Sequence, residues 1–258
     1  MQLNGKTVVI TGASSGIGKA VALEMARRGA RLFLAARRLD LLESVAAECR
    51  AVGVSCTAVA TDVSRREDCI RLLETAGVVD VLINNAGFAI FDAIADAKPE
   101  ELVSMMQTNY FGAVWCAQAA LPGMLARKSG TIVNVASITG IMGFARMGGY
   151  CATKSAMLAF SEALRDEVLG RGVRVAMVCP ATTDTAFFEK AERGKMPGAS
   201  RLILAIRPER VARAVCNAAE DGAYRRILPF TANLYMRLKE IAPRTAHFFM
   251  RRVSAWLE

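Results

Sequence analysis

Residues 7–18 read TVVITGASSGIG, a short run of β-branched and aliphatic residues that leads directly into a glycine-rich turn. The run at 7–11 is typical of a parallel strand that is buried on both faces. The turn lets the backbone approach a phosphate group, and the helix expected over 19–28 points the positive end of its dipole there. Glycines also occur in simple tight turns, but this turn follows a strand and begins a helix, as phosphate binding requires.

The alternation of apolar strand and amphipathic helix continues along the chain. We expect a long helix at 39–51 and further strands at 31–36, 55–60, 79–83, 131–136 and 173–178. Strands that alternate with helices form a parallel sheet covered on both faces. The predicted fold class is therefore α/β, a doubly wound parallel sheet over residues 1–229, followed by a C-terminal amphipathic helical extension over 230–258.

Composition sets broad limits on the class of protein. The 258 residues are 53% apolar and 22% charged, as in a well-packed globular protein. The apolar stretch at 113–126 is interrupted by Gln118 and Pro122, so we expect no membrane span, and no signal segment precedes the first strand. The seven cysteines have no motif spacing, which predicts reduced packing thiols in a cytoplasmic protein and no metal site.

Residues 150–154 read YCATK. On a helix, Tyr150 and Lys154 stand one turn apart on the same face, so the ammonium can lie beside the phenol. A positive charge favours the ionised form of a phenol whose ordinary pKa is ~10, which would make Tyr150 a general acid or base toward an alcohol or carbonyl. Ser137 ends the predicted strand 131–136, and its hydroxyl could hold the same substrate oxygen. Taken alone, this pair of residues is more often a surface Tyr over a solvated Lys.

Polar residues also follow two other predicted strands. Asp62 could accept a hydrogen bond from an adenine amine, or it could be an exposed turn residue. Residues 84–87 read NNAG and would place compact polar groups beside a bound nucleotide, or would form an ordinary turn between strand and helix. Ligands of a doubly wound sheet bind at these carboxyl ends of the strands.

In combination, TGxxxGxG at 11–18, NNAG at 84–87, Ser137 and YxxxK at 150–154 resemble the short-chain dehydrogenase/reductase family over about the first 185 residues. The resemblance implies a single-domain Rossmann fold that binds a nicotinamide cofactor. It implies that Tyr150 is the acid/base, that Lys154 lowers the pKa of Tyr150 and holds the nicotinamide ribose, and that Ser137 positions the substrate oxygen. Asn109 matches the family's anchor of a proton relay through water. The residues expected at the cofactor are Gly12, Ser14, Ser15, Gly16, Ile17, Gly18, Arg37, Arg38, Asp62, Val63, Asn85, Ala86, Gly87, Tyr150, Lys154, Pro180, Thr183 and Thr185.

The second strand predicts the form of the cofactor. An enzyme that uses NAD(H) carries an acidic residue there for the ribose 2′-hydroxyl, whereas a 2′-phosphate needs a cation. Here Arg37 and Arg38 follow the strand, so we expect NADP(H), with Ser14 and Ser15 as additional partners of the phosphates.

One motif departs from the family. Pro180 is followed by Ala181 where the family commonly has glycine, and a turn that needs positive φ would be penalised there. We expect a small local shift, with Thr183 and Thr185 kept as the contacts to the nicotinamide amide. Cys151 and Cys179 have no partner that would make them nucleophiles, so we expect them to pack.

The substrate is expected to be a lipophilic carbonyl or alcohol, such as a 3-oxoacyl or steroid-like compound. Residues 187–188 and 194–198 should form a cover over the site, and its aromatic residues would join an apolar pocket. The other pocket residues, which could equally be core, are Ile138, Ile141, Met142, Phe144 and Met147.

Residues 230–258 carry five basic and two acidic residues among apolar residues at helical spacing, with Pro243 between two short helices. This pattern fits a segment that lies on an anionic membrane, or a helical pair packed on its own domain or on a partner subunit. No nucleic-acid motif accompanies the net charge of +9, and His247 is expected on the surface.

The sequence therefore predicts an NADP(H)-dependent oxidoreductase that interconverts a small-molecule carbonyl and a secondary alcohol. The alternative is a non-catalytic NADP(H)-binding sensor or membrane-associated binding protein on the same fold. Relatives of this kind are commonly homo-dimers or homo-tetramers, and the apolar residues Met157, Leu158 and Phe160 would permit such contacts.

Overall fold

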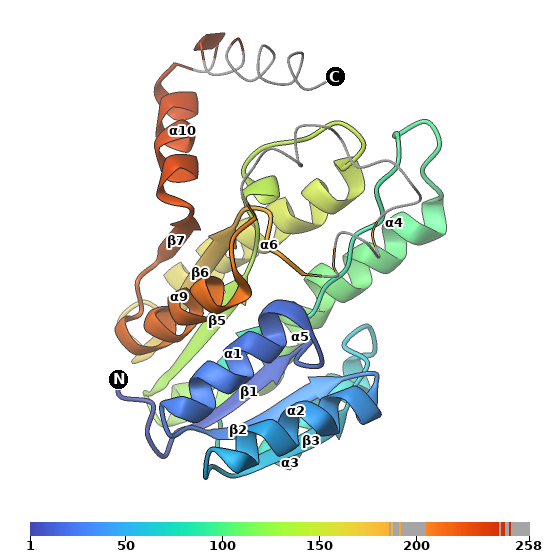
Figure 1. Cartoon of the computed structure of the whole chain (residues 1–258). Coiled ribbons are helices and arrows are strands. Elements are labelled where there is room, and N and C mark those ends of the chain that lie inside the picture. Colours follow the sequence, from blue (N-terminus) through green and yellow to red (C-terminus); the bar gives the residue numbers. More distant parts are fainter. Residues whose placement is uncertain (186, 188–190, 192–204, 243, 246–247, 249–258) are drawn as a thin grey trace.

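The computed structural model describes residues 1–185, 187, 191, 205–242, 244–245 and 248 (Figure 1). The strands are β1 (Thr7–Thr11), β2 (Arg31–Ala36), β3 (Cys56–Ala60), β4 (Val81–Asn84), β5 (Gly130–Val135), β6 (Val173–Pro180) and β7 (Arg225–Leu228). The α-helices are α1 (Gly16–Arg27), α2 (Leu39–Ala51), α3 (Arg66–Ala76), α4 (Pro99–Met106), α5 (Gly112–Ala126), α6 (Gly148–Glu167), α9 (Pro208–Asp221) and α10 (Phe230–Ile241). A π-helical turn, η1 (Gln107–Phe111), joins α4 to α5, and a 3-10 turn, η2 (Ile138–Gly140), follows β5.

All seven strands lie in one parallel sheet in the order β3-β2-β1-β4-β5-β6-β7. The six strands expected from the sequence are present, and α2 has the expected bounds. The direction in which strands are added reverses between β1 and β4, so the carboxyl ends of these two strands flank the crevice where such sheets bind ligands. The predicted fold class is confirmed, and the strand β7 is an addition to it.

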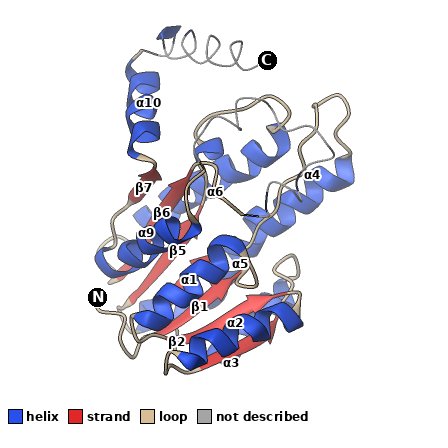
Figure 2. Cartoon of the chain, viewed as in Figure 1, coloured by secondary structure: helices blue, strands red, loops and turns tan. Residues whose placement is uncertain are grey.

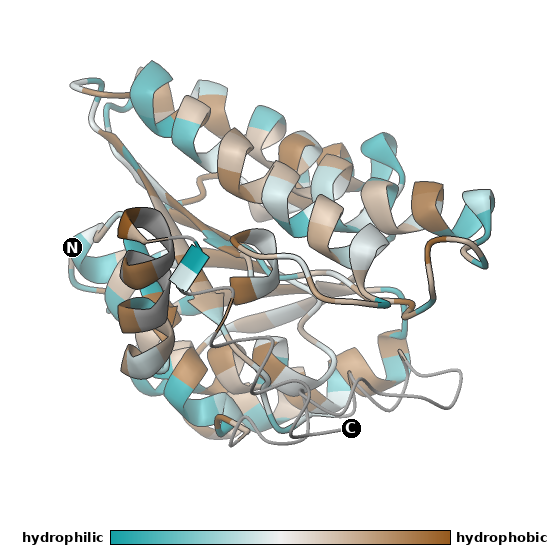
Figure 3. Cartoon of the chain, turned by 90° about the horizontal axis from the view of Figure 1, so that it is seen from above, coloured by the Kyte–Doolittle hydropathy of each residue, from teal (hydrophilic) through white to brown (hydrophobic). Residues whose placement is uncertain are grey.

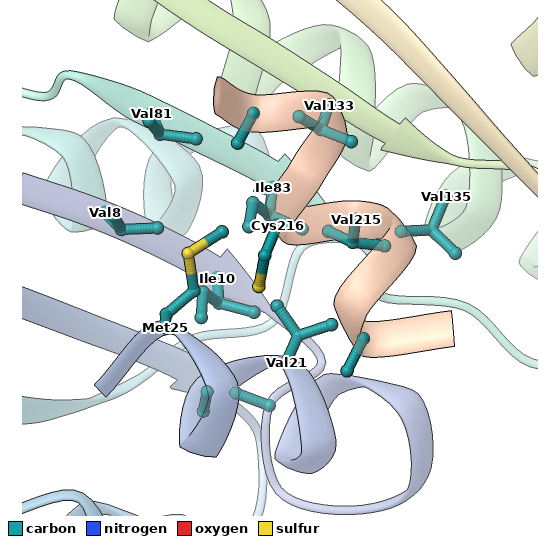
Figure 4. Packing of buried hydrophobic residues seen from close by; sticks show 14 of the residues in the cluster. Val8, Ile10, Val21, Met25, Val81, Ile83, Val133, Val135, Val215 and Cys216 are labelled. Carbon is teal, nitrogen blue, oxygen red and sulfur yellow. The ribbon is translucent and has the colours of Figure 1, made fainter. Parts of the chain in front are cut away.

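Helices cover both faces of the sheet (Figure 2). On one face α2 packs over β2 and β3, while α1 and α9 pack over the centre of the sheet, where Val21, Met25 and Val215 meet Ile10 and Ile83 (Figure 4). On the other face α3, α5 and α6 bury a second cluster against the same sheet. Figure 3 shows hydrophobic and hydrophilic residues side by side on the helices, which explains why each helix buries one face only.

The buried side chains correct one expectation about subunit contacts. Met157 and Leu158 on α6 are only 1% and 9% exposed and pack inside the chain. They are therefore core residues, and they are not available to a partner subunit as the sequence suggested.

The cysteines lie in the interior, as expected. All seven are buried free thiols. Burial in apolar surroundings raises the pKa of Cys151 and raises the pKa of Cys179 to about 12, because the charged thiolate is disfavoured there. Both remain neutral thiols, which suits packing and opposes a nucleophilic role.

The last described element, α10, stands out from the body of the molecule beyond β7 (Figure 1). Among the described residues no helix is both long and apolar enough to cross a membrane. The predicted division of the chain at residues 229 and 230 stays a prediction, and His247, with 249–258, lies outside the described residues.

Candidate active site

The glycine-rich turn after β1 is packed closely against two other loops. Gly12 and Gly16 have φ of +67° and +55°, which L side chains rarely adopt. A Cβ on Gly12 would lie 2.7 Å from the Cα of Ala86, and one on Gly18 would lie 2.2 Å from the carbonyl oxygen of Gly12. A Cβ on Gly16 would lie 3.3 Å from Cγ2 of Thr185. The loops after β1, β4 and β6 thus meet at one end of the sheet.

Asn85 ties the loop after β4 to this turn. Its Nδ2 donates to the carbonyl oxygens of Thr11 and Gly12 at 3.0 and 3.2 Å. The hydroxyl of Thr11 in turn accepts from the backbone N–H groups of Asn85 and Ala86, each at 3.1 Å. The Asn85 amide therefore shapes the turn that would hold the phosphates.

Tyr150 lies near the start of α6 and is only 7% exposed. Burial raises the pKa of the Tyr150 phenol above its ordinary value, and a hydrogen bond with Ser137 opposes this rise. The phenol is therefore protonated at neutral pH. Ser137 Oγ also accepts from the backbone N–H of Thr139 at 3.1 Å, which fixes its position after β5.

Lys154 is buried one turn along α6 and is 4% exposed. Its Nζ donates to the carbonyl oxygen of Val135 at 3.0 Å and lies 5.8 Å from the centre of the Tyr150 ring. Burial lowers the pKa of Lys154 to about 8. The net pKa of the Tyr150 phenol is raised here, and burial is the largest cause; the lowering expected from Lys154 stays a prediction.

Asn109 lies within the π-helical turn η1 and is fully buried. Its Nδ2 donates to the carbonyl oxygen of Phe88 at 2.8 Å and to Oγ1 of Thr153 at 3.0 Å, while its Oδ1 accepts from the N–H of Phe88 at 2.9 Å. Isolated π-helical turns occur frequently at functional sites. Because the side chain is fully engaged, any relay that starts at Asn109 would use its main chain.

Thr153 is a site residue that the sequence analysis missed, although it lies inside YCATK. Its hydroxyl accepts from Asn109 and donates to the carbonyl oxygen of Tyr150 at 2.8 Å. It thereby links η1 to the first turn of α6. A Cβ on Gly87 would lie 3.0 Å from Oδ1 of Asn109 and 3.7 Å from Nζ of Lys154. Gly87, the last residue of NNAG, therefore lies next to both of these side chains.

The other expected cofactor residues lie around the same crevice. Arg37 and Arg38 follow β2, are exposed, and form no ion pair within the described part of the chain. Asp62 Oδ1 accepts from the N–H and the hydroxyl of Ser64 at 3.0 and 2.7 Å, so this oxygen stabilises its own turn. The Val63 side chain belongs to the second core cluster beneath that turn. In the glycine-rich turn Ser15 is exposed, whereas Ser14 and Ile17 are half-buried.

The loop after β6 accommodates Ala181 without strain. Ala181 is not among the described residues with positive φ, and its N–H donates to the carbonyl oxygen of Leu228 at 2.8 Å. The expected penalty at this turn therefore does not arise. Thr183 Oγ1 donates to the carbonyl oxygen of Ala181 at 3.1 Å, and Thr183 forms a parallel bridge with Ile206.

Apolar side chains surround the phenol. Phe91 and Phe187 place their ring centres 6.3 and 5.7 Å from that of Tyr150. The remaining members of this cluster are Phe88, Ala89, Ile90, Leu102, Met105, Phe144, Met147, Cys151 and Ala191. Of the expected pocket residues, Ile138 and Ile141 pack in other clusters, and Met142 is half-buried. Residues 188 and 194–198 of the expected cover lie outside the described residues.

The sequence analysis missed the segment after NNAG, which reads FAIF at 88–91 and supplies part of this apolar wall. An apolar run directly after a strand-end motif was the available signal. In the described part of the chain no group of three His, Cys, Asp or Glu side chains is arranged to hold a metal ion.

Comparisons with known proteins agree with this arrangement. The family model described as short chain dehydrogenase matches residues 6–195. The chain is 31% identical over 257 residues to the 17-beta-hydroxysteroid dehydrogenase 13 of Homo sapiens, with 97% of this chain and 83% of the relative covered. It is 38% identical over 193 residues to the NADP-dependent 3-hydroxy acid dehydrogenase of Schizosaccharomyces pombe, with 72% and 74% covered.

Solved structures show the same architecture. A short chain dehydrogenase/reductase from Burkholderia phymatum in complex with NAD matches with a TM-score of 0.84 at 26% identity, over 93% of this chain and 94% of that one. A short-chain dehydrogenase from Sphingobium yanoikuyae in complex with NADPH matches with a TM-score of 0.81 at 29% identity, over 96% and 95%. Neighbours of this fold therefore bind either form of the nicotinamide cofactor.

Proposed function

Because the chain belongs to the short-chain dehydrogenase family and is an oxidoreductase of that family, we propose that it uses NADP(H) to interconvert a lipophilic carbonyl compound and a secondary alcohol. The observation that carries the proposal is the convergence of Tyr150, Ser137 and Lys154 beside the glycine-rich turn. A Cβ would clash at Gly12 and at Gly18, so the turn needs residues without side chains, as a backbone that approaches a pyrophosphate does.

The protein contributes proton transfer and orientation. When bound, the nicotinamide supplies or accepts the hydride at the substrate carbon. In the direction of reduction, the protonated Tyr150 donates its proton to the carbonyl oxygen, and Ser137 stabilises the phenolate that remains. Lys154 carries a positive charge at neutral pH because its pKa of about 8 still lies above 7. The raised pKa of Tyr150 keeps the phenol protonated, as proton donation to a carbonyl oxygen requires.

The preference for NADP(H) rests on the end of β2. Arg37 and Arg38 are exposed there and are not engaged with a carboxylate in the described part of the chain, so both guanidinium groups can approach a 2′-phosphate. A relative named as NADP-dependent and a neighbour bound to NADPH support this choice.

The lipophilic substrate rests on the apolar cluster around the phenol. Phe91, Phe187, Met105 and Met147 form an apolar wall on one side of Tyr150, and the Lys154 Nζ lies 5.8 Å from the centre of its ring. Such a pocket favours apolar carbonyl compounds over small sugars. The name of one relative, a hydroxysteroid dehydrogenase, fits a lipophilic substrate.

We place the protein in the cytoplasm as a homo-dimer or homo-tetramer. Because Met157 and Leu158 are buried, the contact would use the outer side of α4 and η1, where Val103 and Phe111 are 56% and 41% exposed. Sedimentation analysis of Phe111→Glu beside the unchanged protein tests this surface, and an unchanged mass would contradict it.

The test of the proposed function is NADPH consumption by the purified protein on a panel that runs from short polar ketones to long 3-oxoacyl and steroid-like compounds. We expect turnover to increase with apolar length and to disappear in Tyr150→Phe, while NADPH binding is retained. Unchanged turnover in Tyr150→Phe would refute its role. Tight NADPH binding without turnover on any compound would favour the non-catalytic sensor.

A further inference from the structure

Helix α10 exposes a row of large apolar side chains. Phe230, Leu234, Leu238 and Ile241 are 73%, 63%, 39% and 84% exposed. Steps of four, four and three residues place these four side chains on one face of a helix. We call these four residues the α10 stripe. Exposed apolar residues are ordinary when scattered, but a continuous row of them marks a surface that contacts something else.

Among the described residues, the contacts of α10 with the rest of the chain lie on other sides of the helix than the stripe. α10 contacts β7, and Ala232 on another side of the helix packs against the first core cluster. Figure 1 shows the helix standing out beyond β7. The exposed side chains of the α10 stripe therefore take no part in the contact of α10 with its own domain, and where the residues after α10 pack stays a prediction.

The size of the stripe argues against a second protein as its main occupant. A helix of 12 residues is about 18 Å long, and a stable protein interface buries about 800 Å² on each partner. One stripe of four side chains is a small part of such an area. An interfacial helix on a membrane, in contrast, needs to bury only its apolar face, to a depth of about 5–10 Å.

The positive charge of this part of the chain indicates which lipids the helix would bind. Arg225 on β7 and Arg244 after α10 are both exposed, and residues 230–258 carry five basic and two acidic residues. Basic residues beside an apolar face attract anionic lipid headgroups. We propose that α10 docks the protein on the surface of a bilayer that contains anionic phospholipid. This proposal is independent of the reaction at Tyr150.

The test is co-sedimentation of the full chain with vesicles of phosphatidylcholine alone and of phosphatidylcholine with phosphatidylserine. We expect binding to the phosphatidylserine vesicles that weakens as salt is added. Leu234→Glu should weaken this binding by about tenfold or more, because it places a charge in the apolar face. The matched control is Leu169→Glu, the same exchange at a 73% exposed leucine in the turn before β6, which lies at the opposite end of the sheet from α10. This control should bind as the unchanged protein does.

Retained NADPH binding shows that both variants are folded. Failure of the unchanged protein to bind either kind of vesicle overturns the proposal, and so does equal binding by Leu234→Glu. Equal binding to both kinds of vesicle overturns the selectivity for anionic lipid. A fall in oligomer mass in Leu234→Glu without any vesicle binding would identify a second copy of the chain as the occupant of the α10 stripe.

Discussion

Replacing Thr153 by Val should separate the π-helical turn from the first turn of α6. The Thr153 side chain is fully buried, and its hydroxyl accepts from Asn109 and donates to the carbonyl oxygen of Tyr150. Valine has nearly the same shape but leaves one N–H of the buried Asn109 amide without its partner. Leaving a buried donor unsatisfied costs about 1–3 kcal/mol of the free energy of unfolding.

Thr139 offers a matched control nearby. It is also buried, yet its Oγ1 has no hydrogen-bond partner among the described residues. The same exchange, Thr139→Val, removes a buried hydroxyl that makes no bond, so stability should stay unchanged or increase. Thr153→Ser keeps the hydroxyl and should recover most of the loss.

Urea denaturation of the three variants and the unchanged protein measures these differences, and thermal unfolding should show about 2–4 °C for each kcal/mol. We expect Thr153→Val to lower turnover as well, because the phenol and the turn that carries Asn109 are no longer held together. Equal destabilisation by Thr153→Val and Thr139→Val would refute the reasoning, since the hydrogen bonds would then not account for the loss.

Three further predictions follow from the site. Arg37→Ala should weaken NADPH binding by about tenfold, which is at the low end for the loss of a charge-assisted hydrogen bond. The same variant should hardly change NADH binding, and a fluorescence titration with each cofactor measures both affinities. An equal loss of affinity for NADPH and NADH would contradict the contact between Arg37 and the 2′-phosphate. Gly18→Ala should abolish NADPH binding or lower the free energy of unfolding by more than ~2 kcal/mol, because the new Cβ would lie 2.2 Å from the Gly12 carbonyl oxygen. The control is Gly143→Ala, whose Cβ would have no other atom within 4 Å, and this variant should be neutral in the same assays. The folded-state pKa of Lys154, about 8, lies below its ordinary 10.5, so the unfolded chain binds more protons between these values and this group makes stability rise with pH there. Lys154→Met should remove that rise in denaturation midpoints measured between about pH 8 and pH 10, and a persistent rise of the same size would contradict the assignment.

Local patterns in the sequence predicted the elements whose signals are contained within a few residues. The run TVVITGASSGIG gave the bounds of β1 and the presence of α1, which begins three residues earlier than expected, and YCATK placed Tyr150 and Lys154 together on one helix. In each case a single spacing determines which groups meet. The strand β7, in contrast, is only four residues long and begins with two arginines, so it carries no apolar alternation to reveal it.

What the sequence could not predict depends on burial and on contacts between distant segments. The spacing of Tyr150 and Lys154 indicates that they meet, but not that both lose most of their water, and this loss raises the pKa of Tyr150 above its ordinary value. The link from Asn109 to Thr153 joins residues that are 44 positions apart. No short motif describes such a contact, because it exists only once η1 and α6 are packed.

The bridge between Thr183 and Ile206 has a consequence for how this protein can diversify. It is flanked by two backbone hydrogen bonds, from Asp184 to Ile206 and from Ile206 to Thr182, so the two ends of the segment between them are joined at one fixed point just beyond the end of β6. The residues between these two ends can change in length or composition with little effect on the register of β6 and β7, because loop closure depends only weakly on loop length. A variant in which this one segment is exchanged for another, with both anchors kept, should therefore keep the sheet and its register.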